Sequence, residues 1–180
     1  MPAPDRLPEF ESVALPLLPD LYRTAAAMLR NETEAKDLVQ DVYLHAWKSF
    51  HRFAAGTNCR GWMFQILFHR LHHTRRKLLR FRLLSEDEQF REDHLVAETP
   101  VPTRLSSEEV LAALDELSPE HREVVLLADV EELTCREVSE VLGIPMGTVM
   151  SRLSRARTKL RVTLAGPAAD LGIGQARGSQ

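Results

Sequence analysis

The stretch TCREVSEVLGIPMGTVMSRLSRARTKL, residues 134–160, decides the fold of the second half of this chain. Thr134 and Glu137 have the spacing of a capping box, which opens a helix. Gly143 can end that helix, because glycine readily adopts the left-handed conformation that follows a helix C-terminus. A second helix is predicted to begin near Met146. A short capped helix, a tight turn and a second helix have the layout of a helix-turn-helix.

The second of these helices has two unlike faces. Val149, Leu153, Ala156 and Leu160 recur at helical spacing, so we expect this face to pack against the domain. On the other side, short hydroxyls can approach base edges or phosphates, and longer basic side chains reach further. Residues 146–161 carry five basic residues and no acidic one, which disfavours an ordinary solvated face. The candidate DNA-contacting residues are Thr148, Ser151, Arg152, Arg155 and Lys159.

Outward from this segment, the chain divides into two helical units. A capping box at 106–109 and a Ser118-Pro119 start predict two further helices before it. Residues 85–104, rich in acids and ending in prolines, indicate a flexible linker. The chain is therefore predicted to be all-α, with two small helical domains joined by that linker. The expected bounds are 9–84 for the N-terminal domain, 85–104 for the linker, 105–164 for the C-terminal helix-turn-helix domain and 165–180 for a disordered tail.

The N-terminal domain is predicted to consist of helices broken by prolines and one loop. A first helix begins near Glu9 and is interrupted around Pro16, and a second starts near Pro19 and runs to about Arg30. Thr33 is a good N-cap for the next helix, which runs to about residue 50 and carries an apolar stripe. Residues 51–58 form a loop, and a long helix follows from about Cys59 to Leu79 or beyond.

The long helix carries a polar and basic stripe about three turns long, which could lie along DNA. The stripe consists of Gln65, His69, His72 and Arg76, and the loop residues Thr57 and Asn58 precede it. The Asn58 amide can donate and accept together, which suits the edge of an extruded base. Spacing alone does not separate this role from simple capping of the helix. Residues 61–84 hold six basic residues and no acidic one, whereas 106–140 hold eleven acidic and two basic residues.

Several function classes are disfavoured. No apolar run reaches the length of a membrane span, and the first residues lack the layout of a signal peptide. Two cysteines, Cys59 and Cys135, make no disulfide framework, so a reducing cytoplasm fits best. His69 and His73 could chelate zinc, but no further ligand lies nearby, so no metal or cofactor is expected. No phosphate-binding glycine loop or nucleophile–base arrangement is recognisable, so the chain is not expected to be an enzyme.

Four segments resemble extracytoplasmic-function sigma factors of the sigma-70 family. GIPMGTVMSRLSRAR at 143–157 and LSPEHREVV at 117–125 resemble the region that reads the minus-thirty-five promoter element. GTNCRGWMFQIL at 56–67 resembles the promoter-melting segment, which captures a flipped minus-ten base. DLVQDVYLHAW at 37–47 resembles the segment that docks on the clamp helices of the largest polymerase subunit. That match implies polymerase contacts by Asp37, Gln40, Asp41 and Leu44, although physics alone favours a solvated face there.

The resemblance implies a transcription initiation factor that binds core RNA polymerase and promoter DNA. Its expected partners are the clamp helices of the largest subunit, the flap of the second-largest subunit, and an anti-sigma factor. FESVALP at 10–16 and LYRTA at 21–25 resemble a subgroup that answers thiol oxidation under a zinc-containing anti-sigma factor. Two alternatives stay open: a helix-turn-helix regulator that acts without docking on polymerase in this way, and a metal-responsive sensor built on the histidines.

Overall fold

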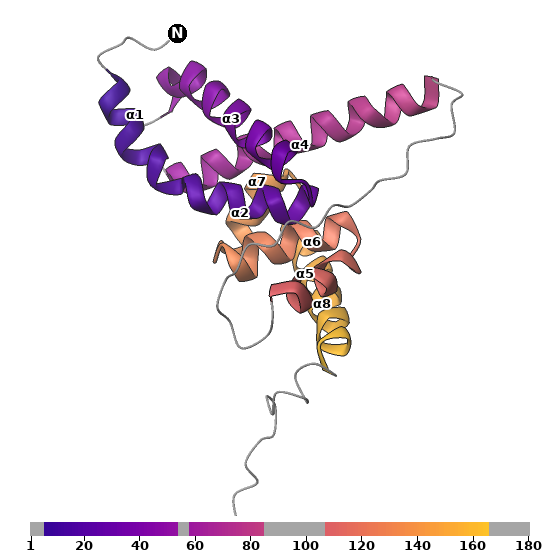
Figure 1. The fold of residues 1–180 in the computed structure, drawn as a ribbon. Helices are drawn as coiled ribbons and strands as arrows, with labels where there is room; N and C mark the ends of the chain where they lie inside the picture. The colour runs from indigo at the N-terminus through magenta and orange to yellow at the C-terminus, as the bar shows by residue number, and fades with distance from the viewer. Residues whose placement is uncertain (1–5, 54–57, 85–106, 166–180) are drawn as a thin grey trace, which may run out of the picture.

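The computed structural model describes residues 6–53, 58–84 and 107–165, and every regular element among them is helical (Figure 1). This confirms the all-α prediction. The N-terminal domain contains α1 (Leu7–Ala14), α2 (Leu18–Leu29), α3 (Glu32–Ser49) and α4 (Cys59–Leu84), with short 3₁₀ turns η2 (Leu15–Leu17) and η3 (Phe50–Arg52). The C-terminal domain contains α5 (Ser107–Asp115), α6 (Pro119–Val125), the π-helical turn η4 (Leu126–Val130), α7 (Cys135–Leu142) and α8 (Met146–Thr163).

The domain bounds stay predictions. The segment 85–104 expected as a linker and the tail from residue 166 onward lie outside the described residues, as do Ser106 and Thr57.

The helix boundaries follow the proline and cap signals with one error. Pro19 lies in the first turn of α2, and α2 ends at Arg30 in the left-handed conformation, with φ 55°. The predicted N-cap Thr33 is wrong, because α3 begins two residues earlier. Asn31 is extended and its side-chain oxygen accepts a hydrogen bond from the Glu34 N–H at 3.1 Å. The left-handed turn at Arg30 leaves Asn31 free to cap, and asparagine caps at least as well as threonine.

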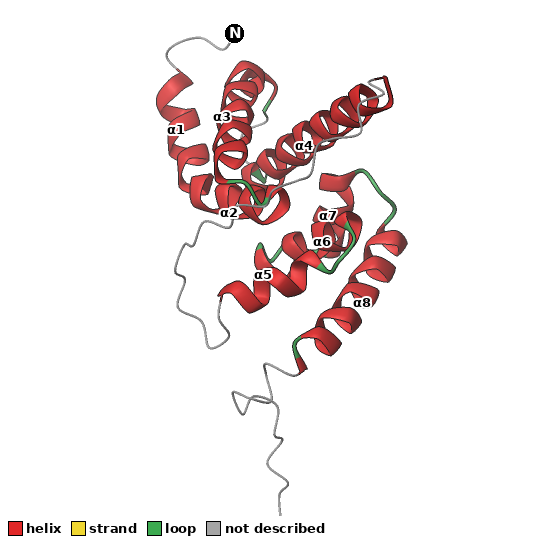
Figure 2. Ribbon diagram, turned by 45° about the vertical axis from the view of Figure 1, so that its right-hand side comes forward, coloured by secondary structure: helices red, strands yellow, loops and turns green. Residues whose placement is uncertain are grey.

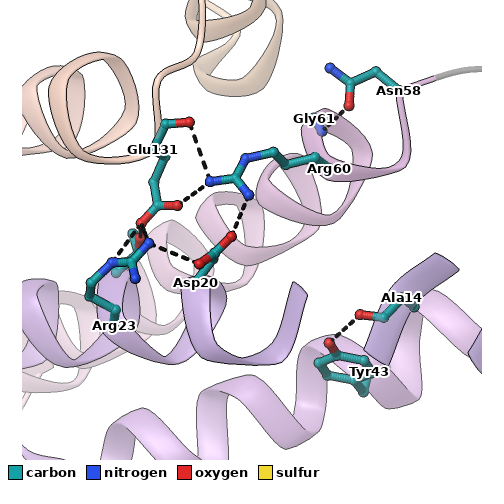
Figure 3. Close-up of polar contacts among 9 residues, drawn as sticks. Ala14, Asp20, Arg23, Tyr43, Asn58, Arg60, Gly61 and Glu131 are labelled. Carbon is teal, nitrogen blue, oxygen red and sulfur yellow. Dashed lines mark hydrogen bonds and ion pairs between the residues drawn. The ribbon is translucent and has the colours of Figure 1, made fainter. Parts of the chain in front are cut away.

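The apolar stripe of α3 forms the core of the N-terminal domain, as predicted. Phe50 is fully buried, and Phe10 of α1 packs edge-on against its ring with centroids 5.1 Å apart. The Tyr43 hydroxyl donates a 2.7 Å hydrogen bond to the Ala14 carbonyl, which ties α3 to the end of α1 (Figure 3). Burial raises the pKa of Tyr43 to about 12. This hydrogen bond therefore fixes α1 against α3, although the two residues are 29 positions apart in the sequence.

The helix-turn-helix forms as its sequence predicts. Both hydrogen bonds of the Thr134–Glu137 capping box are present, and Gly143 ends α7 with φ 64°. The Ser139 hydroxyl donates to the Ile144 carbonyl at 2.6 Å, which fixes the turn between α7 and α8. Val149 and Ala156 of α8 are fully buried, so the predicted apolar face does pack against the domain.

The two domains are in direct contact. Helix α7 packs on α4, and α6 packs on α2, so the buried apolar residues form one continuous core (Figure 2). Figure 2 shows α8 at the outer side of the C-terminal domain, with α6 and α7 between it and the N-terminal helices. The domain contact therefore involves the first helix of the helix-turn-helix rather than the predicted recognition helix.

Candidate nucleic-acid and polymerase interface

The polar side of α3 is exposed where polymerase contacts were expected. Asp37 and Gln40 are exposed, and Leu44 is 54% exposed beside them. Asp41 is half-buried and its carboxylate accepts a hydrogen bond from Arg70 of α4. The four residues thus form one surface, in which Asp41 also has an intramolecular partner.

The predicted DNA-contacting side of α8 is largely exposed. Ser151 and Arg155 are exposed, whereas Thr148 and Arg152 are half-buried. The Ser151 hydroxyl donates to the Thr148 carbonyl at 3.1 Å, and Lys159 donates to the backbone oxygen of Glu116. Two exposed methionines, Met146 and Met150, lie on the same helix and were not anticipated from the sequence. At helical spacing they fall on a different side of α8 from Arg152, Arg155 and Lys159.

Asn58 occupies the position from which it can cap α4. Its side-chain oxygen accepts a 3.1 Å hydrogen bond from the Gly61 N–H, which is a capping contact (Figure 3). Its amide nitrogen donates to the Glu137 carboxylate of α7 at 2.6 Å. The Thr134 backbone N–H, the Thr134 hydroxyl and the Asn58 amide together lower the pKa of Glu137. The capping role, left open by the spacing, is therefore present together with a contact between domains.

The stripe on α4 is brought to one side of the helix but is partly covered by the C-terminal domain. Gln65 donates to the Glu140 carbonyl at 3.4 Å, and His72 Nε2 lies 2.9 Å from the Glu123 carboxylate. His69 and Arg76 are exposed, and Arg76 donates to the His72 carbonyl. The acidic Glu123 of the C-terminal domain thus pairs with part of the basic segment 61–84.

A groove of about 720 Å³ is lined by residues at the start of α4 and by residues of α7. On the N-terminal side it is lined by Asn58, Gln65 and an aromatic pair, Phe53 and Trp62, whose ring centroids are 4.9 Å apart. On the other side lie residues of α7, including Glu137. An amide beside two aromatic rings offers both hydrogen bonding and stacking to a nucleobase.

Glu131 forms an ionic cluster that sequence reasoning missed. Its side chain is 0% exposed, and its carboxylate accepts hydrogen bonds from Arg23 at 2.9 Å, from the Thr24 hydroxyl at 3.0 Å and from Arg60 (Figure 3). Asp20 accepts hydrogen bonds from both arginines. Burial acts to raise the pKa of Asp20, but the hydrogen bonds from Arg60 and Arg23 outweigh it and the pKa is lowered. Arg23 and Arg60 lie outside the basic segment 61–84, so the charge pattern of the sequence did not mark this cluster.

Other chemistry has little support among the described residues. In that part of the chain no group of three or more His, Cys, Asp or Glu side chains could hold a metal ion. Cys59 and Cys135 are free thiols, and burial raises the pKa of Cys59. None of the described helices is long and apolar enough to cross a membrane.

Comparison with known proteins identifies both domains. The family model described as "Sigma-70 region 2" matches residues 15–81, and "Sigma-70, region 4" matches 107–160. The chain is 34% identical over 150 residues to the ECF RNA polymerase sigma factor SigE of Mycolicibacterium smegmatis, covering 81% of this chain and 57% of that protein. It is 31% identical over 150 residues to the sigma factor EcfG of Rhodopseudomonas palustris, covering 83% of this chain and 82% of that protein.

A solved structure agrees over both domains. The sigma factor RpoE of Bartonella quintana, in complex with the anti-sigma factor NepR, has a TM-score of 0.79 and 29% sequence identity. The match covers 88% of this chain and 98% of RpoE. Both family regions are present in order, on the helices that carry the exposed surfaces. The chain therefore belongs to the extracytoplasmic-function group of the sigma-70 family of RNA polymerase sigma factors.

Proposed function

We propose that this sigma factor docks on core RNA polymerase through α3 and contacts promoter DNA through α4 and α8. It acts as a transcription initiation factor and not as an enzyme. The observation that carries the docking assignment is Leu44, an exposed leucine in the middle of a polar helix face. An apolar centre with a polar rim is the anatomy of a protein interface. Asp37, Gln40 and Asp41 supply that rim.

The proposed docking partner is the pair of clamp helices of the largest polymerase subunit. Acidic and amide groups on α3 suit a basic partner surface. The C-terminal domain is proposed to lie on the flap of the second-largest subunit, so that the two domains span the minus-ten and minus-thirty-five elements.

The docking proposal is tested by the double variant Gln40→Ala/Leu44→Ala. We leave Asp41 unchanged because it is paired with Arg70, so its loss would also break a contact between α3 and α4. We expect the affinity for core polymerase, measured by fluorescence titration, to fall by about tenfold or more, as for a truncated interface centre. The matched control is Glu32→Ala/Lys36→Ala, which removes an exposed ion pair from another side of α3. Equal affinities of the two double variants would refute the docking assignment.

The proposed minus-thirty-five contacts are Thr148, Ser151, Arg152, Arg155 and Lys159. An arginine that reads a base edge costs about 1–3 kcal/mol when it is removed and relaxes specificity at one position. We expect this for Arg152→Ala or Arg155→Ala in anisotropy titrations of duplex promoter DNA. The control is Arg161→Ala, which removes an exposed arginine of α8 outside this set. A contact to phosphate alone would weaken binding to all sequences alike. If Arg152→Ala and Arg155→Ala both kept the wild-type affinity and selectivity, α8 would not be the helix that recognises the minus-thirty-five element.

The proposed minus-ten contacts are Thr57, Asn58, Gln65, His69, His72 and Arg76. The groove beside Asn58, with Phe53 and Trp62 in its wall, supports a base-capture role. In vitro transcription with purified core polymerase on a promoter library would identify the element. Binding to a duplex operator without any need for polymerase would instead favour the helix-turn-helix regulator.

We further propose control by an anti-sigma factor, because the structurally similar RpoE is seen in complex with one. The finer assignment, a zinc-containing and thiol-sensing anti-sigma factor, is supported only by the resemblance of segments 10–16 and 21–25. Capture of partners from the native host, followed by zinc analysis with and without a thiol oxidant, tests it. A captured anti-sigma factor without zinc would refute the zinc-containing, thiol-sensing assignment. Control by an anti-sigma factor would still stand.

A further inference from the structure

Two exposed methionines lie at the start of α8. Met146 and Met150 are 52% and 56% exposed, and their spacing of four residues makes their side chains neighbours on one side of the helix. Met1 lies outside the described residues, and the remaining methionines, Met28 and Met63, belong to the core and are 4% and 0% exposed. The fold therefore divides its described methionines into a buried pair and a pair that solvent reaches.

The surroundings of the exposed pair are open. Gly147 follows Met146 in the chain, and a Cβ added there would meet no described side chain of another element within 4 Å. Pro145 occupies the N-cap position of α8 and makes no side-chain cap hydrogen bond to the first turn. A dissolved oxidant can therefore reach the side chains of Met146 and Met150 without any rearrangement of the helices.

The pair lies in the part of α8 that the proposed function places in the major groove. In a helix-turn-helix, the N-terminal residues of the recognition helix contact the base edges. Met146 and Met150 lie in the first two turns, and Ser151 falls between their side of the helix and the side of Arg155. A duplex that receives Ser151 would thus meet an apolar flank on one side and a basic flank on the other. An apolar side chain suits the methyl group of thymine.

Oxidation would change the chemical character of the apolar flank. A peroxide transfers one oxygen atom to the thioether sulfur, which loses two electrons and becomes a sulfoxide. The O–O bond breaks, and the second oxygen of hydrogen peroxide takes up the proton of the transferred oxygen and leaves as water. The sulfoxide is polar and accepts hydrogen bonds but donates none. It therefore loses the apolar contact to a base and gains no bond to phosphate oxygens, which are also acceptors.

We propose that Met146 and Met150 form an oxidation site, at which a peroxide converts the thioethers to sulfoxides and thereby weakens recognition of the minus-thirty-five element. The effect on DNA rests on the proposed function of α8, whereas the selectivity of the oxidation rests on exposure alone. The change is reversible, because methionine sulfoxide reductases return the sulfoxide to the thioether with electrons from a dithiol. The site lies on this chain itself and needs no anti-sigma factor.

The first test identifies the side chains that react. The full chain is treated with hydrogen peroxide, the peroxide is removed with catalase, and the digested protein is analysed by tandem mass spectrometry. Sulfoxide should accumulate at Met146 and Met150 while Met28 and Met63 remain thioethers. In a urea-unfolded control all four should react alike, because burial no longer separates them. Similar oxidation rates of the four methionines in the folded chain would overturn the proposed site.

The second test measures promoter binding by the assembled holoenzyme. Oxidised chain, freed of peroxide, is combined with saturating untreated core polymerase on a fluorescent duplex taken from the promoter library. Oxidation should raise the Kd for this duplex about fivefold or more, which is the loss that one altered base contact commonly causes. A methionine sulfoxide reductase with dithiothreitol should restore the affinity. Unchanged promoter affinity after oxidation, or full recovery with dithiothreitol alone, would overturn the proposal, since dithiothreitol alone reduces only oxidised cysteines.

A pair of variants separates the methionines from every other oxidisable group. Met146→Leu/Met150→Leu keeps two apolar helix formers at exposed positions and retains both cysteines, so its fold should be unaffected. Its promoter affinity should be the same before and after peroxide. The matched control, Met28→Leu, removes a buried methionine and should lose affinity on oxidation as the wild type does. Because each variant is compared with itself before oxidation, equal losses in the double variant and the control would overturn the proposal.

Failure of the proposed function would look different. In that case holoenzyme with Arg152→Ala/Arg155→Ala would bind the promoter as tightly as the unoxidised wild type, because α8 would not contact DNA. The pattern of oxidised methionines found by mass spectrometry would then be unchanged.

Discussion

At the scale of single residues, Asn58 shows how one amide can serve two contacts. Its oxygen caps α4 through the Gly61 N–H, while its nitrogen reaches Glu137 in the other domain. The capping contact alone would accept aspartate, because aspartate caps about as well as asparagine. The contact to Glu137 would not, because two carboxylates would then face each other.

The variant Asn58→Asp separates these roles from base capture. We expect the thermal stability of the N-terminal domain to be retained, and the contact to Glu137 to be lost by repulsion. Promoter melting should fall at least as far as in Asn58→Ala, because the amide donor is gone and a negative charge faces DNA. Permanganate footprinting of the minus-ten region checks this. If Asn58→Asp melted the promoter normally, Asn58 would have structural contacts but no role in capturing a base.

Tyr43 offers a pH test at the same scale. Its pKa is raised by burial to about 12, so folding favours the neutral phenol. The stability from this group is therefore complete below its ordinary pKa of 10.0 and is lost as the pH rises toward about 12. Tyr43→Phe should lose about 1 kcal/mol at neutral pH with the hydrogen bond to Ala14, and should show a weaker alkaline loss. Urea unfolding across this range measures both, and parallel curves for the two proteins would contradict the assignment.

At the scale of elements, the start of α3 is fixed by Asn31 and not by the predicted Thr33. Asn31→Ala should lower the free energy of unfolding by about 1 kcal/mol, because one N–H of the first turn loses its acceptor. Thr33→Ala, at an exposed position inside the first turn, is the control and should change stability little. Chemical denaturation of both variants is sufficient, and a larger loss for Thr33→Ala would restore the original prediction.

Most helices could be predicted from the sequence because their signals are local. The Thr134–Glu137 box, Gly143 and Pro19 act within a turn or two, and the apolar faces follow helical periodicity. The cap of α3 failed because Asn31 and Thr33 are both good caps, and the left-handed Arg30 that decides between them carries no glycine signal. The candidate site residues could be named but not their partners. Arg60 and Glu131 are 71 residues apart, and no periodic pattern relates them.

At the scale of the whole molecule, an interface stabilised by ion pairs should respond to ionic strength. Salt screens half-exposed partners such as Arg23 and Arg75, whereas the apolar core that both domains share is less affected. We expect calorimetry at low salt to show one cooperative transition, because the domains support each other. At high salt the transition should broaden or separate into two. A single transition of unchanged width at all salt concentrations would mean that apolar packing alone joins the domains.

The outward position of α8 bears on the order in which this protein meets DNA. Arg155 and Ser151 are exposed on α8, whereas the exposed Asn58 side chain is hydrogen-bonded to Glu137 of α7. Contacts between basic side chains and phosphates are independent of base sequence and let a protein slide along duplex DNA. The chain could therefore contact duplex DNA with α8 while Asn58 is still bonded to Glu137. Search along duplex DNA would then precede capture of an unpaired base in time.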